Sequence, residues 1–76
     1  MTKVKIYTAP ICFECERAKK FFKDKGIKYE EIDTFENKEK AEEVFKKSGV
    51  KRIPIIEIGE KIFTGFDKKK IEEELK

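Results

Sequence analysis

The sequence predicts an α/β protein, with a mixed four-stranded sheet flanked by three helices in the order β-α-β-α-β-β-α. Two observations lead to this prediction. Apolar residues alternate with polar ones in short runs, whereas in other segments they recur at the three- and four-residue spacing of a helix. A helix-length segment joins the first two strand-like runs, which makes them parallel with a right-handed crossover, and a tight turn joins the last two.

The first half of the chain has the pattern of a strand, a helix and a second strand. Residues 3–8 alternate apolar and polar side chains and form the first strand. Residues 13–25 form a helix that Gly26 ends, since glycine adopts the left-handed conformation of a helix C-terminus at little cost. Residues 27–33 form the second strand, with successive side chains on opposite faces.

The second half of the chain adds a helix, a hairpin and a final helix. Asn37 is placed to cap the middle helix, and Gly59 begins a two-residue turn of type II′. Asp67 is placed to cap the last helix. The middle helix is predicted to follow its cap at Asn37 and to run to about Lys47. The predicted bounds are 54–58 and 61–64 for the two hairpin strands and 68–75 for the last helix.

Length and charge exclude several classes of protein. The chain has 76 residues, which predicts a single domain over residues 1–76. Its formal net charge is +3, from 19 basic and 16 acidic residues that are interspersed, so we expect no nucleic-acid partner. No stretch approaches the roughly 20 apolar residues of a membrane span, and Lys5 interrupts any signal-peptide core. We therefore expect a cytoplasmic monomer with no membrane partner.

The only two cysteines, Cys12 and Cys15, lie between the first strand and the first helix. In the cytoplasm such a pair is more often catalytic or metal-binding than structural. Thiol–disulfide exchange requires a thiolate, and the pKa of a cysteine at a helix N-terminus falls from about 8.5 to roughly 3.5–7.5. We expect Cys12 to be the exposed attacking thiolate and Cys15, one turn inward, to be the resolving thiol. Glu14 lies between them and opposes thiolate formation by its charge.

Two other interpretations of the cysteine pair stay open. The pair could be an inert buried pair or a stapling disulfide. It could also bind metal, but zinc usually takes four Cys or His ligands, and this chain offers two Cys and no His. No metal site is therefore predicted within one chain; only a dimer, or a cluster completed by added thiols, supplies enough ligands.

The segment that opens the third strand can also be interpreted in two ways. Pro54 has no N–H and suits the first residue of a strand. The alternative is a cis Ile53–Pro54 bond, although only about 5–6% of X-Pro bonds in folded proteins are cis, so the residues alone favour trans. Lys51 and Arg52, just before this segment, are either a solvated loop or cations that steer an acidic partner.

Taken together, these residues resemble a glutaredoxin-like member of the thioredoxin fold over nearly the whole chain. The resemblance rests on three blocks, Ile6-Tyr7-Thr8 leading into Cys12-x-x-Cys15, Ile53-Pro54, and Gly65-Phe66-Asp67. It implies that the Ile53–Pro54 bond is cis and that the Ile53 backbone binds an extended substrate as an added strand. The substrate-binding residues that we expect are Phe13, Ile53, Pro54, Gly65, Phe66 and Asp67.

Three of these residues have a structural role as an alternative. Phe13 either lines the substrate groove or covers the helix start, and Phe66 either lines the groove or packs in the core. Asp67 is first an N-cap and second a group that holds a substrate amine.

The chain resembles two subfamilies that differ in their source of electrons. Glutathione-using glutaredoxins often carry Lys three residues before the first cysteine, where this chain has Ala9. Thr64-Gly65-Phe66 is instead similar to the Ser-Gly-Phe of small redoxins that serve ribonucleotide reductase and are reduced by thioredoxin reductase. We expect a redoxin that reduces protein disulfides, with ribonucleotide reductase as a candidate, and that is re-reduced by such a reductase.

Two alternative functions remain. The first is a glutathione-dependent glutaredoxin, with glutathione as the reductant and no bound cofactor. The second is a dimeric iron–sulfur carrier that uses Cys12 from each chain and two external thiols.

Overall fold

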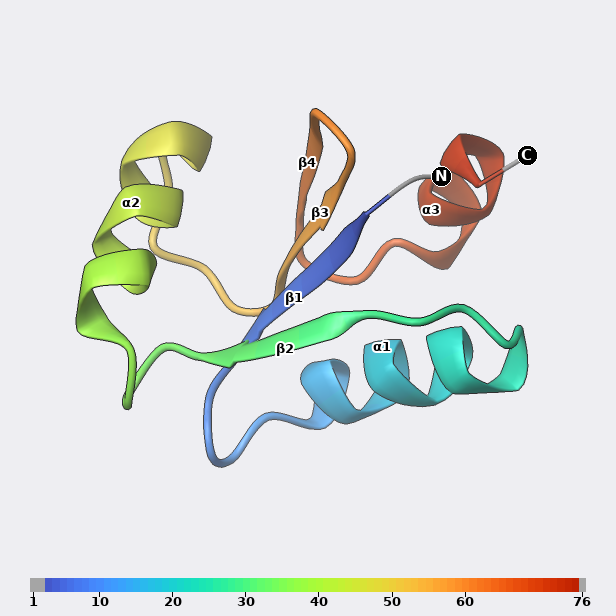
Figure 1. Cartoon of the computed structure of the whole chain (residues 1–76), viewed down its shortest axis with the longest axis horizontal. Coiled ribbons are helices and arrows are strands. Elements are labelled where there is room, and N and C mark those ends of the chain that lie inside the picture. The colour runs from blue at the N-terminus through green and yellow to red at the C-terminus, as the bar shows by residue number, and fades with distance from the viewer. Residues whose placement is uncertain (1–2, 76) are drawn as a thin grey trace.

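A computed structural model describes residues 3–75, and it has the α/β architecture that the sequence predicts (Figure 1). Four strands form one mixed sheet in the order β2-β1-β3-β4, and three helices flank it. The strands are β1 (Val4–Thr8), β2 (Glu30–Asp33), β3 (Ile55–Ile58) and β4 (Lys61–Thr64). The helices are α1 (Phe13–Asp24), α2 (Lys38–Ser48) and α3 (Lys68–Glu74).

The pairing of the strands matches the prediction. β1 is parallel to β2, with Tyr7 opposite Ile32, and antiparallel to β3, with Tyr7 opposite Ile55. β3 and β4 form an antiparallel hairpin. Gly59, the first residue of the hairpin turn, has a positive φ of 61°. No non-glycine residue among those described has a positive φ, so the second turn residue has a negative one. This combination is the one that a type II′ turn requires.

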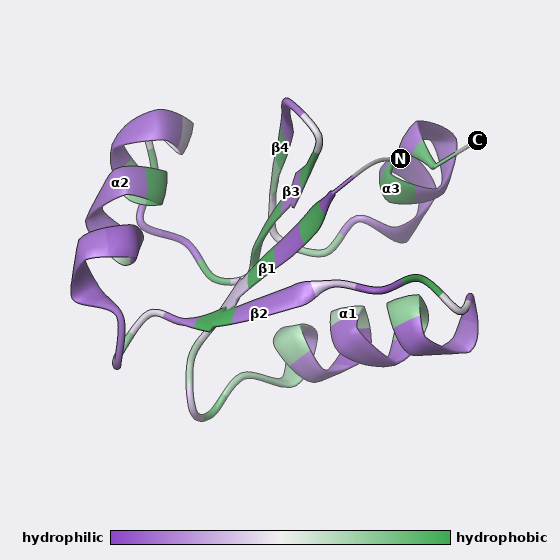
Figure 2. Cartoon of the chain, in the orientation of Figure 1, coloured by the Kyte–Doolittle hydropathy of each residue, from purple (hydrophilic) through white to green (hydrophobic). Residues whose placement is uncertain are grey.

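Apolar side chains form a core on each face of the sheet. α1 and α3 cover one face and α2 covers the other, and Figure 2 shows that the apolar side of α1 faces the strands. This three-layer arrangement explains why β1 and β3 are buried on both sides. The first core comprises Val4, Ile6, Ala18, Phe21, Phe22, Ile56, Ile58 and Ile71. The second comprises Tyr7, Ile32, Val44 and Ile55.

Two local predictions were wrong. The second strand begins at Glu30 instead of residue 27. Its pairing with β1 starts with Glu30 opposite Lys5, near the start of β1. The Ile27 N–H does not join this ladder, because it donates to the Phe22 carbonyl at 2.9 Å. Asn37 precedes α2 as predicted, but its side chain makes no capping hydrogen bond. The preceding turn is held by Asp33, whose Oδ1 accepts from the Phe35 N–H at 2.8 Å.

Four connecting segments meet at one edge of the sheet. β1 and β2 end at this edge, while β3 begins there and β4 ends there, because Ile55 lies opposite both Tyr7 and Thr64. The segments are residues 9–12, 34–37, 49–54 and 65–67. The cysteine pair and the proline segment therefore belong to the same edge. Within residues 3–75, no helix is long and apolar enough to cross a membrane.

Candidate active site

Cys12 and Cys15 form a disulfide at the start of α1, with their Cα atoms 5.2 Å apart. Cys12 is the N-cap residue of the helix, in an extended conformation with φ −156° and ψ 104°. Its Sγ accepts a hydrogen bond from the Cys15 N–H at 3.2 Å. The sulfur thus occupies the position that a Ser or Asp oxygen takes in an ordinary N-cap. Because this donor and the helix dipole both favour negative charge, the site stabilises a thiolate on Cys12.

The two sulfur-bearing residues differ in exposure. Cys15 is 1% exposed, whereas Cys12 is half-buried. Cys15 lies on the buried side of α1 together with Ala18 and Phe22. A partner can therefore approach Cys12, but it cannot approach Cys15 without displacing the core, and the two cysteines are unequal as nucleophiles.

The proline segment lies beside β4 at the same edge of the sheet. The Ile53–Pro54 peptide bond is cis, Pro54 is buried and Ile53 is half-buried. The Gly65 N–H donates to the Pro54 carbonyl at 2.7 Å, which holds the segment before α3 against the start of β3. Gly65 has φ 85°, a conformation that glycine adopts at little cost and that a side chain would strain.

The remaining predicted site residues occupy three different environments. Phe13 is 85% exposed at the first position of α1, so most of its surface is open to solvent. Phe66 is half-buried and its ring packs edge-to-face on Phe21, with centroids 5.6 Å apart. Asp67 caps α3, with its carboxylate accepting from the Lys70 N–H at 3.3 Å. Phe66 therefore makes the packing contact, and Asp67 the capping contact, that the sequence analysis gave as the structural role of each.

Sequence reasoning missed three exposed apolar residues. Within residues 3–75 the large apolar side chains that are exposed are Ile11 (89%), Phe13, Phe35 (68%) and Val50 (42%). All four lie in, or directly beside, the segments at the cysteine edge of the sheet. Ile11, next to Cys12, fits neither a helical nor a strand pattern of apolar residues, and this misfit was the sequence signal that could have indicated its exposure.

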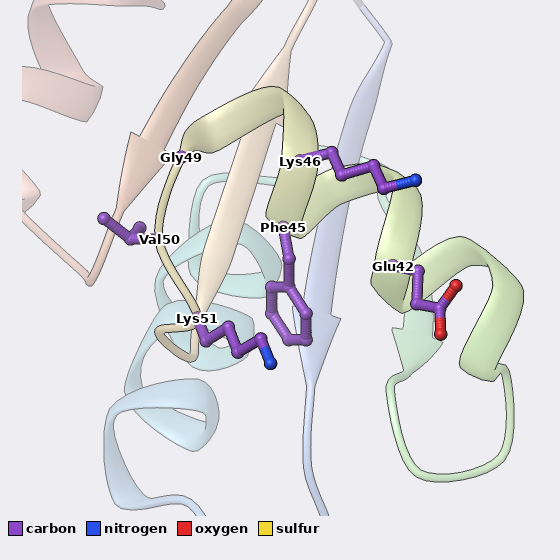
Figure 3. A pocket seen from close by; sticks show the side chains of 6 residues that line it. All are labelled: Glu42, Phe45, Lys46, Gly49, Val50 and Lys51. Atoms are coloured by element: carbon purple, nitrogen blue, oxygen red, sulfur yellow. The ribbon is translucent and has the colours of Figure 1, made fainter.

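A hollow of about 480 Å³ lies between the end of α2 and the segment that leads to Ile53 (Figure 3). The Phe45 ring and Val50 supply its apolar wall, and Lys46 and Lys51 place ammonium groups at its margin. Glu42 and Gly49 complete the lining. The lining therefore combines an apolar wall with charged groups of both signs.

A polar cluster ties the start of α1 to the sheet. The Lys19 ammonium lies 3.0 Å from Glu16 and 3.1 Å from Glu31, and the Thr8 hydroxyl donates to the same Glu31 carboxylate at 3.0 Å. The hydrogen bond to Glu16, aided by Glu31 and opposed by burial, raises the pKa of Lys19 above its ordinary value. Lys19 is therefore a fixed cation one helical turn after Cys15, and it holds α1 in place.

Comparisons with known proteins agree with this geometry. The family model described as glutaredoxin matches residues 4–63. The chain is 37% identical to glutaredoxin 3 of Escherichia coli (strain K12) over 67 residues, which cover 88% of the chain and 81% of the relative. The glutaredoxin of Archaeoglobus fulgidus has a similar structure, with a TM-score of 0.86 at 28% identity, covering 100% of this chain and 88% of that one. The NrdH-redoxin of Escherichia coli has the same fold, with a TM-score of 0.80 at 24% identity, covering 93% and 92%.

Proposed function

The chain belongs to the glutaredoxin family and is a thiol–disulfide oxidoreductase, and we propose that it reduces protein disulfides with electrons from a thioredoxin-reductase-like enzyme. One observation carries the chemical part of this proposal. The Cys12 sulfur sits at the helix N-cap within reach of a partner, while Cys15, 5.2 Å away between Cα atoms, is buried beneath it. This asymmetry supports Cys12 as the attacking thiolate and Cys15 as the resolving thiol.

The reaction proceeds in two exchanges of sulfur. The Cys12 thiolate attacks one sulfur of a partner disulfide; the partner S–S bond breaks, a mixed disulfide forms, and the partner's other sulfur leaves and takes up a proton. Cys15 then loses its proton and attacks the Cys12 Sγ. The mixed disulfide breaks, the Cys12–Cys15 disulfide forms, and the second partner sulfur leaves as a thiol. Two electrons and two protons pass to the partner.

The surface around Cys12 supports a protein as the partner. Ile11 and Phe13 flank the cysteine and are almost fully exposed, so a partner that covers them gains apolar burial that a small polar disulfide cannot offer. The Ile53 backbone lies two residues before β3, and among residues 3–75 it makes none of the backbone hydrogen bonds of turns, loops or caps, which supports its pairing with an extended segment of such a partner. We propose that the protein acts in a reducing compartment, the cytoplasm, with ribonucleotide reductase as one candidate substrate.

A reductase as electron source rests on what this chain lacks for glutathione. Ala9 stands where glutathione-using relatives often carry Lys. The Escherichia coli NrdH-redoxin, described as a glutaredoxin-like protein with a thioredoxin-like activity profile, shares the fold. Glutathione is the second candidate reductant, favoured by the 37% identity to glutaredoxin 3.

The test supplies the oxidised protein with each reductant separately. One reaction contains glutathione buffers poised at about −220 to −260 mV, and the other contains NADPH and a thioredoxin reductase. Thiols are counted by mass spectrometry at timed intervals. We expect fast reduction by the enzyme and slow reduction by glutathione. Fast reduction by glutathione alone would reject the reductase and leave the oxidoreductase assignment intact.

Two serine variants test the roles of the cysteines. Cys12→Ser removes the nucleophile, so we expect no reduction of a protein disulfide. Cys15→Ser keeps the nucleophile and removes the resolving thiol, so the mixed disulfide should accumulate as a covalent adduct. An active Cys12→Ser protein, or a Cys15→Ser protein that never forms an adduct, would contradict the assignment of attack and resolution.

A further inference from the structure

Five cations stand on the two segments that we expect to border the substrate groove. Lys51 and Arg52 precede Ile53 and Pro54, and Lys68, Lys69 and Lys70 form the first turn of α3. All five are exposed. Among residues 3–75, the ion pairs use Lys19, Lys25, Lys40 and Lys47, and none of these five cations takes part.

The same two segments hold almost no negative charge. Residues 49–56 contain no acidic residue, and residues 61–71 contain only Asp67. The Asp67 carboxylate already accepts the Lys70 N–H as a helix cap. Charges are interspersed over the chain as a whole, but here they are segregated. These two segments therefore carry a local excess of positive charge.

Backbone and side-chain contacts bring the two segments together. The Gly65 N–H donates to the Pro54 carbonyl at 2.7 Å, and a Cβ atom on Gly65 would lie 3.9 Å from the Arg52 Nε. The Arg52 side chain therefore lies along the backbone of Gly65, and the lysine run begins three residues later. A segment that pairs with Ile53 would extend between these cations.

The placement of the lysines opposes the electrostatic preference of the helix itself. Helix N-termini favour acidic residues and C-termini favour basic ones. α1 and α2 follow this rule, with acids in the first turn and lysines in the last. α3 reverses it, with Lys68–Lys70 at its start and Glu72–Glu74 at its end. Stability of the helix does not explain this order, whereas recognition of a negative partner does. The recognising groups are the side-chain cations, since the helix is too short to bind an anion by its backbone.

We propose that this surface selects protein partners whose disulfide is flanked by carboxylates. The proposal deepens the proposed function and rests on it. A protein segment is the occupant because a partner that reaches Cys12 also meets the exposed side chains of Ile11 and Phe13, so its recognition involves apolar contact as well as charge. Arg52, beside Gly65, is placed to pair with a carboxylate of a segment bound along Ile53, and the lysines raise the rate of encounter.

The test compares three disulfide-linked peptides of identical length and apolar content. One carries two Glu beside the cysteine, one two Gln and one two Lys. The second-order rate constant for their reduction by the reduced protein is measured in about 10 mM and about 1 M salt. We expect the acidic peptide to react about tenfold faster than the neutral one at low salt, and this preference to vanish at high salt.

Variants locate the preference on the molecule. Lys51→Gln/Arg52→Gln and Lys68→Gln/Lys69→Gln should each reduce the ratio of acidic to neutral rate constants by about threefold or more. Lys20→Gln/Lys23→Gln, on the exposed side of α1, makes the same change in net charge outside the groove and should leave the ratio unchanged. Arg52→Glu makes the same change in charge with one substitution and should reduce the ratio at least as far.

The outcomes separate this proposal from the function on which it rests. Equal rates for the three peptides at low salt, or an equal loss in the α1 control, would overturn the proposal while disulfide reduction stands. If the protein reduced glutathione disulfide faster than the acidic peptide, the cations would instead recognise glutathione, and the proposal would be overturned. If the protein reduced none of the peptides, the proposed function would be refuted, and so would the selectivity that rests on it.

Discussion

Replacing Tyr7 by Phe tests the polar contact buried between β1 and β3. The Tyr7 hydroxyl donates to the Glu57 carboxylate at 2.8 Å, and Glu57 is 9% exposed. A hydrogen bond to a charged group contributes about 1.5–3 kcal/mol. Glu57 keeps the Lys47 ammonium at 3.4 Å, so we expect a loss in the lower part of that range, about 2 kcal/mol. For a domain of this size the melting temperature should fall by roughly 8–16 °C.

Chemical unfolding in urea gives the free energy directly, and Tyr29→Phe is the matched control. The Tyr29 ring packs on Phe22, and its hydroxyl makes no hydrogen bond within the described chain. Tyr29→Phe therefore removes the same oxygen atom without leaving a buried carboxylate short of a hydrogen-bond donor. The double variant Tyr7→Phe/Glu57→Leu removes both partners and should recover part of the loss. If Tyr7→Phe costs no more than Tyr29→Phe, the buried hydrogen bond does not contribute as argued.

Two further predictions concern the same sheet and its edge. Burial first, and then the hydrogen bond to Glu57, raise the pKa of Tyr7 above its ordinary value near 10. The folded state holds this proton more tightly, so its contribution to stability is complete below about pH 10 and declines as the pH rises further. Urea midpoints measured from about pH 9 to 11 should therefore fall more steeply for the wild type than for Tyr7→Phe, and parallel curves would count against this reasoning. Gly65→Ala and Gly49→Ala impose the same left-handed strain, at φ 85° and φ 80°, and should each cost about 1 kcal/mol. Only Gly65→Ala should also slow the reduction of a protein disulfide, because the Gly65 N–H holds the Pro54 carbonyl and we expect Gly65 to border the substrate groove. Equal rates for the two variants would contradict this role of Gly65.

The elements that the sequence predicted correctly depend on residues close together in the chain. The helix of residues 13–25 follows from the spacing of Ala18, Phe21 and Phe22, and the structure confirms it to within one residue. The wrong start of the second strand has a different origin. Ile27 and Tyr29 continue the alternation and pack on the core, but they lie outside the ladder because pairing with β1 begins at Lys5. A strand boundary depends on its neighbour in the sheet, which periodicity cannot locate.

The buried Glu57 was invisible to sequence reasoning for a similar reason. It interrupts an apolar strand, and its partners, Tyr7 and Lys47, lie 50 and 10 residues away in the chain. Nothing local indicates that a carboxylate there is satisfied. The same holds for Arg52, which is a plain loop residue until the fold places it beside Gly65. Interactions between distant residues had to come from the structure.

The candidate site depends both on residues that are close in the chain and on residues that only the fold brings together. The first kind carries out the chemistry, and the second kind is proposed to select the partner. The thiolate, its hydrogen-bond donor and the resolving thiol all lie between Cys12 and Cys15, within one helical turn. The cations proposed to choose the partner lie about 40 to 55 positions further along the chain, and they reach the site because β3 and the segment after β4 meet at the same edge. Changes to Lys51 or Arg52 should therefore alter which disulfide is reduced and leave the exchange itself intact. A change at Cys12 should abolish reduction of every disulfide alike.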